Sequence, residues 1–133
     1  MFTAVMIVLA MFGGQAKVAA VALPDTPQGK HVQAWVTAFN SGDEKTFMKA
    51  QDELFTPAVL AKRTAKERAK MFQRLKGDFG TMTIDKVSKA TAQQIQIQVT
   101  ARDGAVGTFT FDFEDKAPYR ISGLGIDVQA GDQ

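Results

Sequence analysis

The spacing of apolar residues changes at Gly80, and this change limits the folds that the chain can adopt. Before Gly80, apolar residues recur every three or four positions, which is the period of an amphipathic helix. After Gly80 they alternate with polar residues, which is the period of a strand with one buried face. Helices that precede a run of strands indicate an α+β fold. The 133 residues are enough for one such domain with one core.

The first predicted helix covers residues 27–40. Thr26 can cap this helix, and Pro27 suits its first turn because the missing N–H of proline needs no partner there. Its apolar stripe consists of Val32, Trp35, Val36 and Phe39. The segment Asn40-Ser41-Gly42 ends the helix, since glycine readily takes the left-handed conformation of a helix end. The chain is therefore expected to turn a corner here.

A second helix is predicted after this corner, with Ser41 or Asp43 as its cap. Its inward stripe is apolar except for one residue, Gln51. Thr56-Pro57 then opens a short turn of helix that ends at Leu60.

A third helix is predicted from the capping-box sequence Thr64-Ala65-Lys66-Glu67 onward. Its inward residues are Met71, Phe72 and Leu75. The helix is expected to end near Lys76, because Gly77 and Gly80 follow.

Four strands are predicted after Gly80. The apolar residues that define them are Met82 and Ile84, then Ile95, Ile97 and Val99, then Phe109, Phe111 and Phe113, and finally Tyr119, Ile121, Leu124, Ile126 and Val128. Asp103-Gly104 indicates a hairpin turn. In the last strand the alternation shifts at Ser122-Gly123, which indicates a β-bulge. We therefore expect a curved four-stranded antiparallel meander with helices over one face.

Residues 1–22 are predicted to be a signal peptide. The run from Phe2 to Phe12 is apolar and uncharged, but it is shorter than the ~20 residues of a membrane-spanning helix. Ala20-Val21-Ala22 is a small-residue cleavage motif. Cleavage after Ala22 would leave a periplasmic or secreted domain of residues 23–133. No Lys or Arg precedes the apolar run, so an uncleaved anchor and a buried N-terminal helix stay open as alternatives.

Two stretches resemble a known family. One leads from Leu23-Pro24-Asp25-Thr26-Pro27 to Ala38-Phe39-Asn40-Ser41-Gly42-Asp43, and the other is Pro118-Tyr119-Arg120-Ile121-Ser122-Gly123-Leu124. They are similar to nuclear transport factor 2-like (SnoaL-like) domains. The closest similarity is to a small secreted module found ahead of exported bacterial serine hydrolases and tail-processing proteases. The resemblance implies a cone of three helices closed by a curved sheet, in an exported protein, and it implies no activity.

Enzymes of this fold, such as ketosteroid isomerases and polyketide cyclases, place a carboxylate or a histidine in an apolar cone. His31 lies one position before the apolar stripe of the first helix, where a surface role is expected. Asp85 and Asp112 alternate with apolar residues and should point away from the core. Tyr119 is expected to pack against another aromatic side chain. We therefore name no catalytic residue, and a small isomerase- or cyclase-like enzyme is the alternative function.

A pocket for a small apolar ligand inside the cone is the predicted binding site. Its expected lining residues are Trp35, Phe39, Met48, Phe55, Met71, Phe72, Phe109, Phe111 and Tyr119. Methionine linings adapt to varied partners, although the same residues would also suit a filled core. No metal or cofactor is expected, because the chain has no cysteine and only one histidine.

The formal net charge of +2 favours no particular partner, but positive charge is concentrated in residues 62–76. The predicted basic surface consists of Arg63, Lys66, Lys70 and Arg74, which fall on one helix face. This surface is expected to be solvated, or to contact a membrane or an acidic partner. Nucleic acid is not expected, since an exported protein has little access to it and no aromatic residues interleave with these cations.

The leading prediction is an exported, non-catalytic binding or protein-interaction module. The outer sheet face is rich in polar residues, namely Gln94, Gln96, Gln98, Thr100, Thr108 and Thr110. Folds of this type use that face for pairing, so we expect a homodimer or docking to another exported protein. An Arg120–Asp112 ion pair is expected on the same face. Membrane contact is expected only through an uncleaved N-terminal segment or the basic surface.

Overall fold

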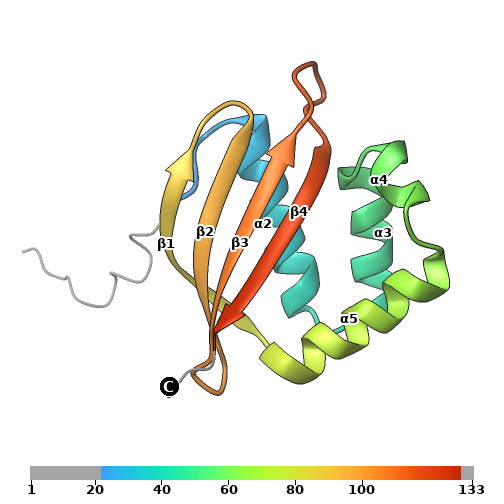
Figure 1. Cartoon of the computed structure of the whole chain (residues 1–133), viewed down its shortest axis with the longest axis vertical. Coiled ribbons are helices and arrows are strands. Elements are labelled where there is room, and N and C mark those ends of the chain that lie inside the picture. The colour runs from blue at the N-terminus through green and yellow to red at the C-terminus, as the bar shows by residue number, and fades with distance from the viewer. Residues whose placement is uncertain (1–21, 130–133) are drawn as a thin grey trace, which may run out of the picture.

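Helices come first and strands follow in the computed structural model, which describes residues 22–129 (Figure 1). The helices are α2 (Pro27–Asn40), α3 (Glu44–Leu54), α4 (Pro57–Ala61) and α5 (Ala65–Phe79). The strands are β1 (Met82–Ala90), β2 (Gln94–Ala101), β3 (Val106–Phe113) and β4 (Ile121–Gln129). The predicted α+β class is confirmed. The described residues contain four helices rather than three, because the short turn expected after Thr56 forms α4.

Side-chain caps define where the helices begin. At α2, Thr26 Oγ1 accepts a hydrogen bond from the backbone N–H three residues later, at 3.1 Å. Asp43, and not Ser41, caps α3 in the same way, at 2.9 Å. The predicted capping box of α5 is present, with Thr64 and Glu67 each accepting a hydrogen bond from the backbone N–H of the other. These boundaries follow from local sequence alone.

Helix α5 continues further than its sequence predicts. It was expected to end near Lys76, but it includes Gly77 and runs to Phe79. The Phe79 side chain is buried, and its ring centroid lies 5.7 Å from that of Phe109. Gly80, with a φ of 66°, then ends the helix. Burial of a phenylalanine side chain stabilises by about 2 kcal/mol, which exceeds the roughly 1 kcal/mol by which a mid-helix glycine is unfavourable.

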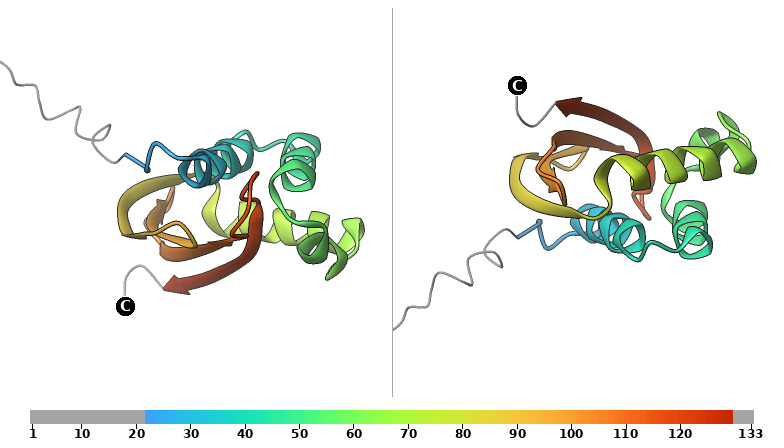
Figure 2. Two further views of the ribbon diagram at one scale, coloured as in Figure 1. Left: turned by 90° about the horizontal axis from the view of Figure 1, so that it is seen from above. Right: turned by 90° about the horizontal axis from the view of Figure 1, so that it is seen from below.

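The strands pair in sequence order as an open antiparallel sheet, which confirms the predicted meander. The predicted bulge in β4 is present at Ser122, which the register between β3 and β4 skips. The pairing of β1 with β2 also skips Asp85 and Ser88, and the sequence analysis did not anticipate these two irregularities. The views in Figure 2 show a bent sheet, as bulges produce.

Strand β4 begins later than predicted. The sequence analysis placed Tyr119 at its start, but this residue has a φ of 60°, which an extended strand does not allow. The strand begins at Ile121, and Tyr119 lies in the loop before it. The expected Arg120–Asp112 ion pair is not among the ion pairs of the described residues. Asp112 instead accepts a hydrogen bond from the Gln94 amide at 2.8 Å.

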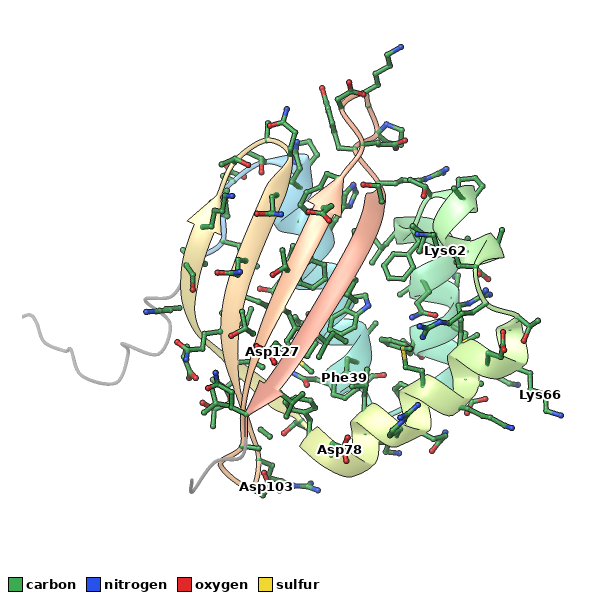
Figure 3. All side chains as sticks on the ribbon, viewed as in Figure 1. Phe39, Lys62, Lys66, Asp78, Asp103 and Asp127 are labelled. Carbon is green, nitrogen blue, oxygen red and sulfur yellow. The ribbon has the colours of Figure 1, made fainter. Side chains whose placement is uncertain are left out.

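The core lies between the helices and one face of the sheet, with Trp35 at its centre. The Trp35 ring centroid lies within 5.9 Å of the centroids of Phe39, Phe47, Phe109 and Phe111. Figure 3 shows Phe39 between the helices and the strands. Alternate residues of β2 and β3 are buried against this cluster, while the residues between them are more exposed. The prediction that helices cover one sheet face is confirmed.

None of the helices within residues 22–129 combines the length and the apolar content that crossing a membrane requires. The predicted signal peptide, apart from Ala22, lies outside the described residues. Its cleavage and the export of the chain stay predictions.

Candidate functional site: a pocket beside the edge strand

A pocket of about 420 Å³ lies between strand β4 and the helices α3, α4 and α5. Strand β4 is at the edge of the sheet, and its first residue is tied to the helices. There Phe55 pairs with Ile121, and the Thr56 N–H donates a hydrogen bond to the Ile121 carbonyl at 3.0 Å. Further along β4, Gly123 lines the pocket with its backbone. The pocket therefore occupies the space beside the edge of the sheet.

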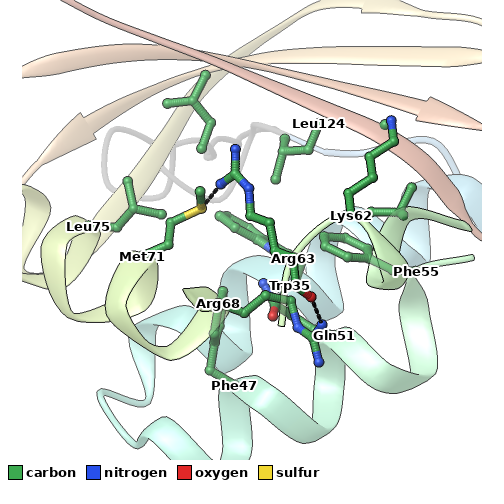
Figure 4. A pocket seen from close by; sticks show the side chains of 13 residues that line it. Trp35, Phe47, Gln51, Phe55, Lys62, Arg63, Arg68, Met71, Leu75 and Leu124 are labelled. Carbon is green, nitrogen blue, oxygen red and sulfur yellow. Dashed lines mark hydrogen bonds between the residues drawn. The ribbon is translucent and has the colours of Figure 1, made fainter. Parts of the chain in front are cut away.

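The pocket has two walls of different character. The helix wall is formed by α2 to α5 and their connections, and consists of Trp35, Phe47, Gln51, Phe55, Val59, Lys62, Arg63, Arg68, Met71 and Leu75. The strand wall consists of Gly123, Leu124 and Ile126. Figure 4 shows Leu124 across the pocket from the side chains of the helix wall. The side chains of the strand wall offer hydrocarbon only, whereas those of the helix wall add an amide, an indole N–H and three cations.

Three buried polar side-chain atoms in the described residues have no hydrogen-bond partner, and all three belong to the helix wall. These atoms are Trp35 Nε1, Gln51 Oε1 and Arg68 Nε. Trp35 is 1% exposed and Gln51 is 6% exposed. Buried polar groups in proteins are normally paired, and an unpaired one costs about 1–3 kcal/mol. The side chains that carry these three atoms all line one pocket, although neighbouring protein atoms cover the atoms themselves, and this pocket is the candidate functional site.

Arg68 is held by several contacts, none of which involves its Nε–H. Its Nη1 donates to the carbonyls of Leu60 at 2.9 Å and Arg63 at 2.8 Å. Its Nη2 lies 3.6 Å from Asp52 Oδ1, and the Arg68 side chain is only 14% exposed. The guanidinium therefore fixes the connection between α4 and α5, and its Nε–H is a buried donor without a partner.

Lys62 and Arg63 form the exposed rim of the pocket. Both residues lie in the connection between α4 and α5, and both are exposed. The Arg63 Nη1 donates to the thioether of Met71 at 3.5 Å, which keeps this cation over the pocket (Figure 4). Sulfur is a weak acceptor, so a ligand oxygen would readily replace it.

Three of the residues predicted to line a pocket do so, namely Trp35, Phe55 and Met71. Four others, Phe39, Phe72, Phe109 and Phe111, are fully buried in the packed core instead. Met48 is half-buried on α3, and Tyr119 lies in the loop before β4. The helical and strand periods identify inward faces correctly, but they do not separate residues of the packed core from residues of a pocket wall.

The predicted basic surface is divided between two environments. Arg63 precedes α5 and lines the pocket. Lys66, Lys70 and Arg74 are exposed on α5, and Figure 3 shows Lys66 pointing away from the domain. Only the first of these four cations therefore contributes to the candidate site.

The polar residues considered for catalysis lie outside the pocket walls. His31 is half-buried on α2, and its Nε2 is 2.9 Å from the Pro118 carbonyl, so this nitrogen carries the proton. Asp85 and Asp112 are exposed, as predicted, and accept hydrogen bonds from Thr100 and Gln94. No cluster of three or more potential metal-ligating side chains occurs in residues 22–129.

The outer sheet face carries a network of side-chain hydrogen bonds. Gln96 donates to Thr110 at 3.1 Å, beside the Gln94–Asp112 pair on the same two strands. These side chains remain partly accessible. Homodimerisation through this face stays a prediction.

Arg68 is not among the site residues predicted from the sequence, although a signal for it exists. Arg68 precedes the inward residues Met71, Phe72 and Leu75 by three, four and seven positions, so it shares their helix face. An arginine on an inward face indicates a buried or pocket-facing cation. Gln51 carried the same signal as the one polar member of the α3 stripe.

No family model, curated protein or solved structure matches the chain. The function is therefore inferred from the geometry of the pocket.

Proposed function

We propose that the chain is an exported, non-catalytic binding module that holds a small apolar ligand in the pocket beside β4. The observation that carries this proposal is the gathering of Trp35 Nε1, Gln51 Oε1 and Arg68 Nε, all without partners, in the walls of a single pocket. The export part of the proposal depends on the N-terminal sequence alone.

The three unpaired atoms are unfavourable for folding, and a ligand would remove that penalty. A buried polar atom without a partner costs about 1–3 kcal/mol. Apolar side chains of similar size at these positions would avoid this cost. A ligand with a polar group at the helix wall would pair the atoms, and its apolar part would contact the leucine and isoleucine of the strand wall. The volume of about 420 Å³ falls in the usual range for small-molecule sites.

The chemistry of the walls supports binding rather than proton transfer. In the pocket that the structure describes, the lining residues supply an indole, an amide, cations and hydrocarbon, and none is a carboxylate or an imidazole. General-base catalysis of the isomerase type needs one of the latter groups within reach of the substrate. Binding needs only what these walls contain.

We also propose a nuclear transport factor 2-like fold for the domain. The corner after α2 and the segment around Ser122 carry the resemblance in sequence. The order of helices followed by a bent four-stranded antiparallel sheet supports it.

The single tryptophan of the chain provides a direct test, because Trp35 lies in the pocket wall. Titration of the full chain with neutral ω-bromodecanol should give saturable quenching of its fluorescence, since bromine quenches on contact. Leu124→Phe, which narrows the pocket from the strand wall, should weaken binding at least fivefold. Val128→Phe is the matched control, because Val128 is exposed on the same strand. Quenching that never saturates, or that Leu124→Phe leaves unchanged, would contradict the proposal.

A further inference from the structure

We propose that the ligand of this pocket is a single-chain amphiphile with an anionic head group, such as a medium-chain carboxylate. The head would lie at the helix wall, against Trp35 and Arg68, and the aliphatic tail would lie along β4. This inference rests on the proposed function and adds the chemical class of the ligand.

Two of the three unpaired atoms of the helix wall require an acceptor. The indole N–H of Trp35 and the Nε–H of Arg68 can only donate hydrogen bonds. Neighbouring protein atoms cover both groups, so a small side-chain shift must open them to a ligand. A group that then pairs both must offer at least two lone pairs, as the two oxygens of a carboxylate do. Gln51 can provide a third donor, because a half-turn of its amide exchanges the oxygen for the NH₂ group.

The charges around the pocket favour an anion. Lys62, Arg63 and Arg68 all line it, and within the described residues the one ion pair that involves any of them joins Arg68 Nη2 to Asp52 at 3.6 Å. The side chain of Asp52 is 62% exposed, so solvent weakens its hold on the guanidinium. The Arg68 side chain is largely buried, and a charge-assisted hydrogen bond to it would be roughly twice as strong as a neutral one.

The strand wall suits an aliphatic chain. Its side chains, Leu124 and Ile126, are both partly buried and pack against the core. Met71 and Leu75 add flexible hydrocarbon from α5. Figure 4 shows Leu124 across from Trp35, Gln51 and Arg68, so the head and the tail of one molecule could each meet the matching wall.

The pocket volume suits a ligand with one chain. A water-sized group occupies about 30 Å³, so about 420 Å³ accommodates roughly fourteen non-hydrogen atoms. That is a carboxylate with a tail of about ten carbons.

The test compares decanoate with decanol, two probes that share a tail and differ in the charge of the head. Titration calorimetry at pH 7, where the carboxylate is ionised, should show decanoate binding about tenfold more tightly than decanol. The combined variant Lys62→Gln with Arg63→Gln removes the rim cations and should weaken decanoate about fivefold more than it weakens decanol. The matched control is Lys66→Gln with Lys70→Gln, which removes the same charge from the exposed face of α5 and should leave both affinities unchanged.

A second variant tests the buried donors. Trp35→Phe keeps an aromatic ring and removes the N–H, so it should reduce the preference for decanoate over decanol about threefold without abolishing the binding of either. Circular dichroism should confirm that the variant remains folded. The preference measured with Lys62→Gln and Arg63→Gln provides an independent readout if Trp35→Phe does not fold.

Comparison of decanoate with decanol distinguishes a failure of the anionic head group from a failure of the apolar pocket. Equal affinities for decanoate and decanol would overturn the anionic head group and leave the apolar pocket in place. Binding of neither probe would overturn the proposed function itself. An equal loss of decanoate binding in the rim variant and in the α5 control would show that only general charge attraction acts, which also overturns the inference.

Discussion

The side-chain amide of Asn40 forms two hydrogen bonds with the backbone of Met82. Its Nδ2 donates to the Met82 carbonyl and its Oδ1 accepts from the Met82 N–H, both at 2.9 Å. Asn40 is the last residue of α2, and Met82 is the first residue of the edge strand β1. The amide thus pairs with the edge much as a neighbouring strand would. This contact aligns the sheet with the helix that carries Trp35.

Loss of this contact should destabilise the domain. Asn40→Ala removes two hydrogen bonds and leaves both Met82 backbone groups unpaired, so the free energy of unfolding should fall by about 2 kcal/mol. Chemical denaturation measures this change. Gln33→Ala is the control, because it removes a single exposed hydrogen bond on the same helix and should cost less than about 0.5 kcal/mol. Equal losses of unfolding free energy in the two variants would show that the Asn40–Met82 contact stabilises the domain no more than an exposed hydrogen bond does.

The Asp variant at position 40 tests the geometry of the same contact. Asn40→Asp can still accept from the Met82 N–H, but its second oxygen would face the Met82 carbonyl and repel it. At pH 7 it should therefore be less stable than the wild type. Protonation of the new carboxyl restores a donor, so the deficit should shrink below pH 4. A deficit that stays constant with pH would contradict this account.

Replacement of Gln51 by an apolar residue should raise the stability of the domain and weaken ligand binding. Gln51→Met removes the unpaired Oε1 atom and keeps the length of the side chain, so the free energy of unfolding should rise by up to about 1 kcal/mol. The same change should weaken decanoate binding, because the amide is lost from the helix wall. Gln73→Met, at an exposed position of α5, should raise neither stability nor affinity. A Gln51→Met protein that is less stable than the wild type would indicate that Gln51 serves the fold and not the ligand.

The N-cap of α3 should make stability depend on pH. The pKa of Asp43 lies below its ordinary value of 3.8, chiefly because the Thr46 hydroxyl and then the Thr46 N–H donate hydrogen bonds to the carboxylate. A lowered pKa in the folded state means that the ionised carboxylate stabilises the fold above pH 4. This contribution is lost as the pH falls through the folded-state pKa.

Asp43→Ala should accordingly lower the denaturant midpoint at pH 7, and its difference from the wild type should narrow below pH 4. Asp115→Ala changes an exposed acid in the loop between β3 and β4 and should alter the midpoint at neither pH. If the gap between wild type and Asp43→Ala were as wide at pH 3 as at pH 7, the cap would act through a neutral hydrogen bond instead.

Features that depend on neighbours three or four residues away could be predicted from the sequence. The cap at Thr26, the capping box at Thr64 and the bulge at Ser122 all belong to this class, because the groups that form them are close in the chain. The α+β class and the inward faces followed from apolar spacing for the same reason. These predictions needed no knowledge of which elements pack together.

Features that join distant segments could not be predicted in this way. Asn40 and Met82 are 42 positions apart, and nothing near either residue shows that they pair. In the sequence, Arg68 is one of several cations of residues 62–76. Its burial depends on carbonyls in the connection between α4 and α5, which the sequence does not reveal. The pocket depends on the separation between β4 and three helices, a distance that no local pattern encodes.

The end of α5 likewise depends on a contact between distant segments, because its last residue, Phe79, packs against Phe109. The sequence analysis treated Gly77 and Gly80 alike as helix-ending residues, but Gly77 is helical, whereas Gly80 has a φ of +66°. A side chain at Gly77 would meet nothing within 4 Å, so Gly77→Ala should raise the free energy of unfolding by up to about 1 kcal/mol. Gly80→Ala should lower it by about 1 kcal/mol or more, because L side chains disfavour this φ and a Cβ would also lie 2.7 Å from Arg102 Nη2. Thermal denaturation should therefore move the two midpoints in opposite directions, and a shift in the same direction would show that α5 does not extend past Lys76 in solution.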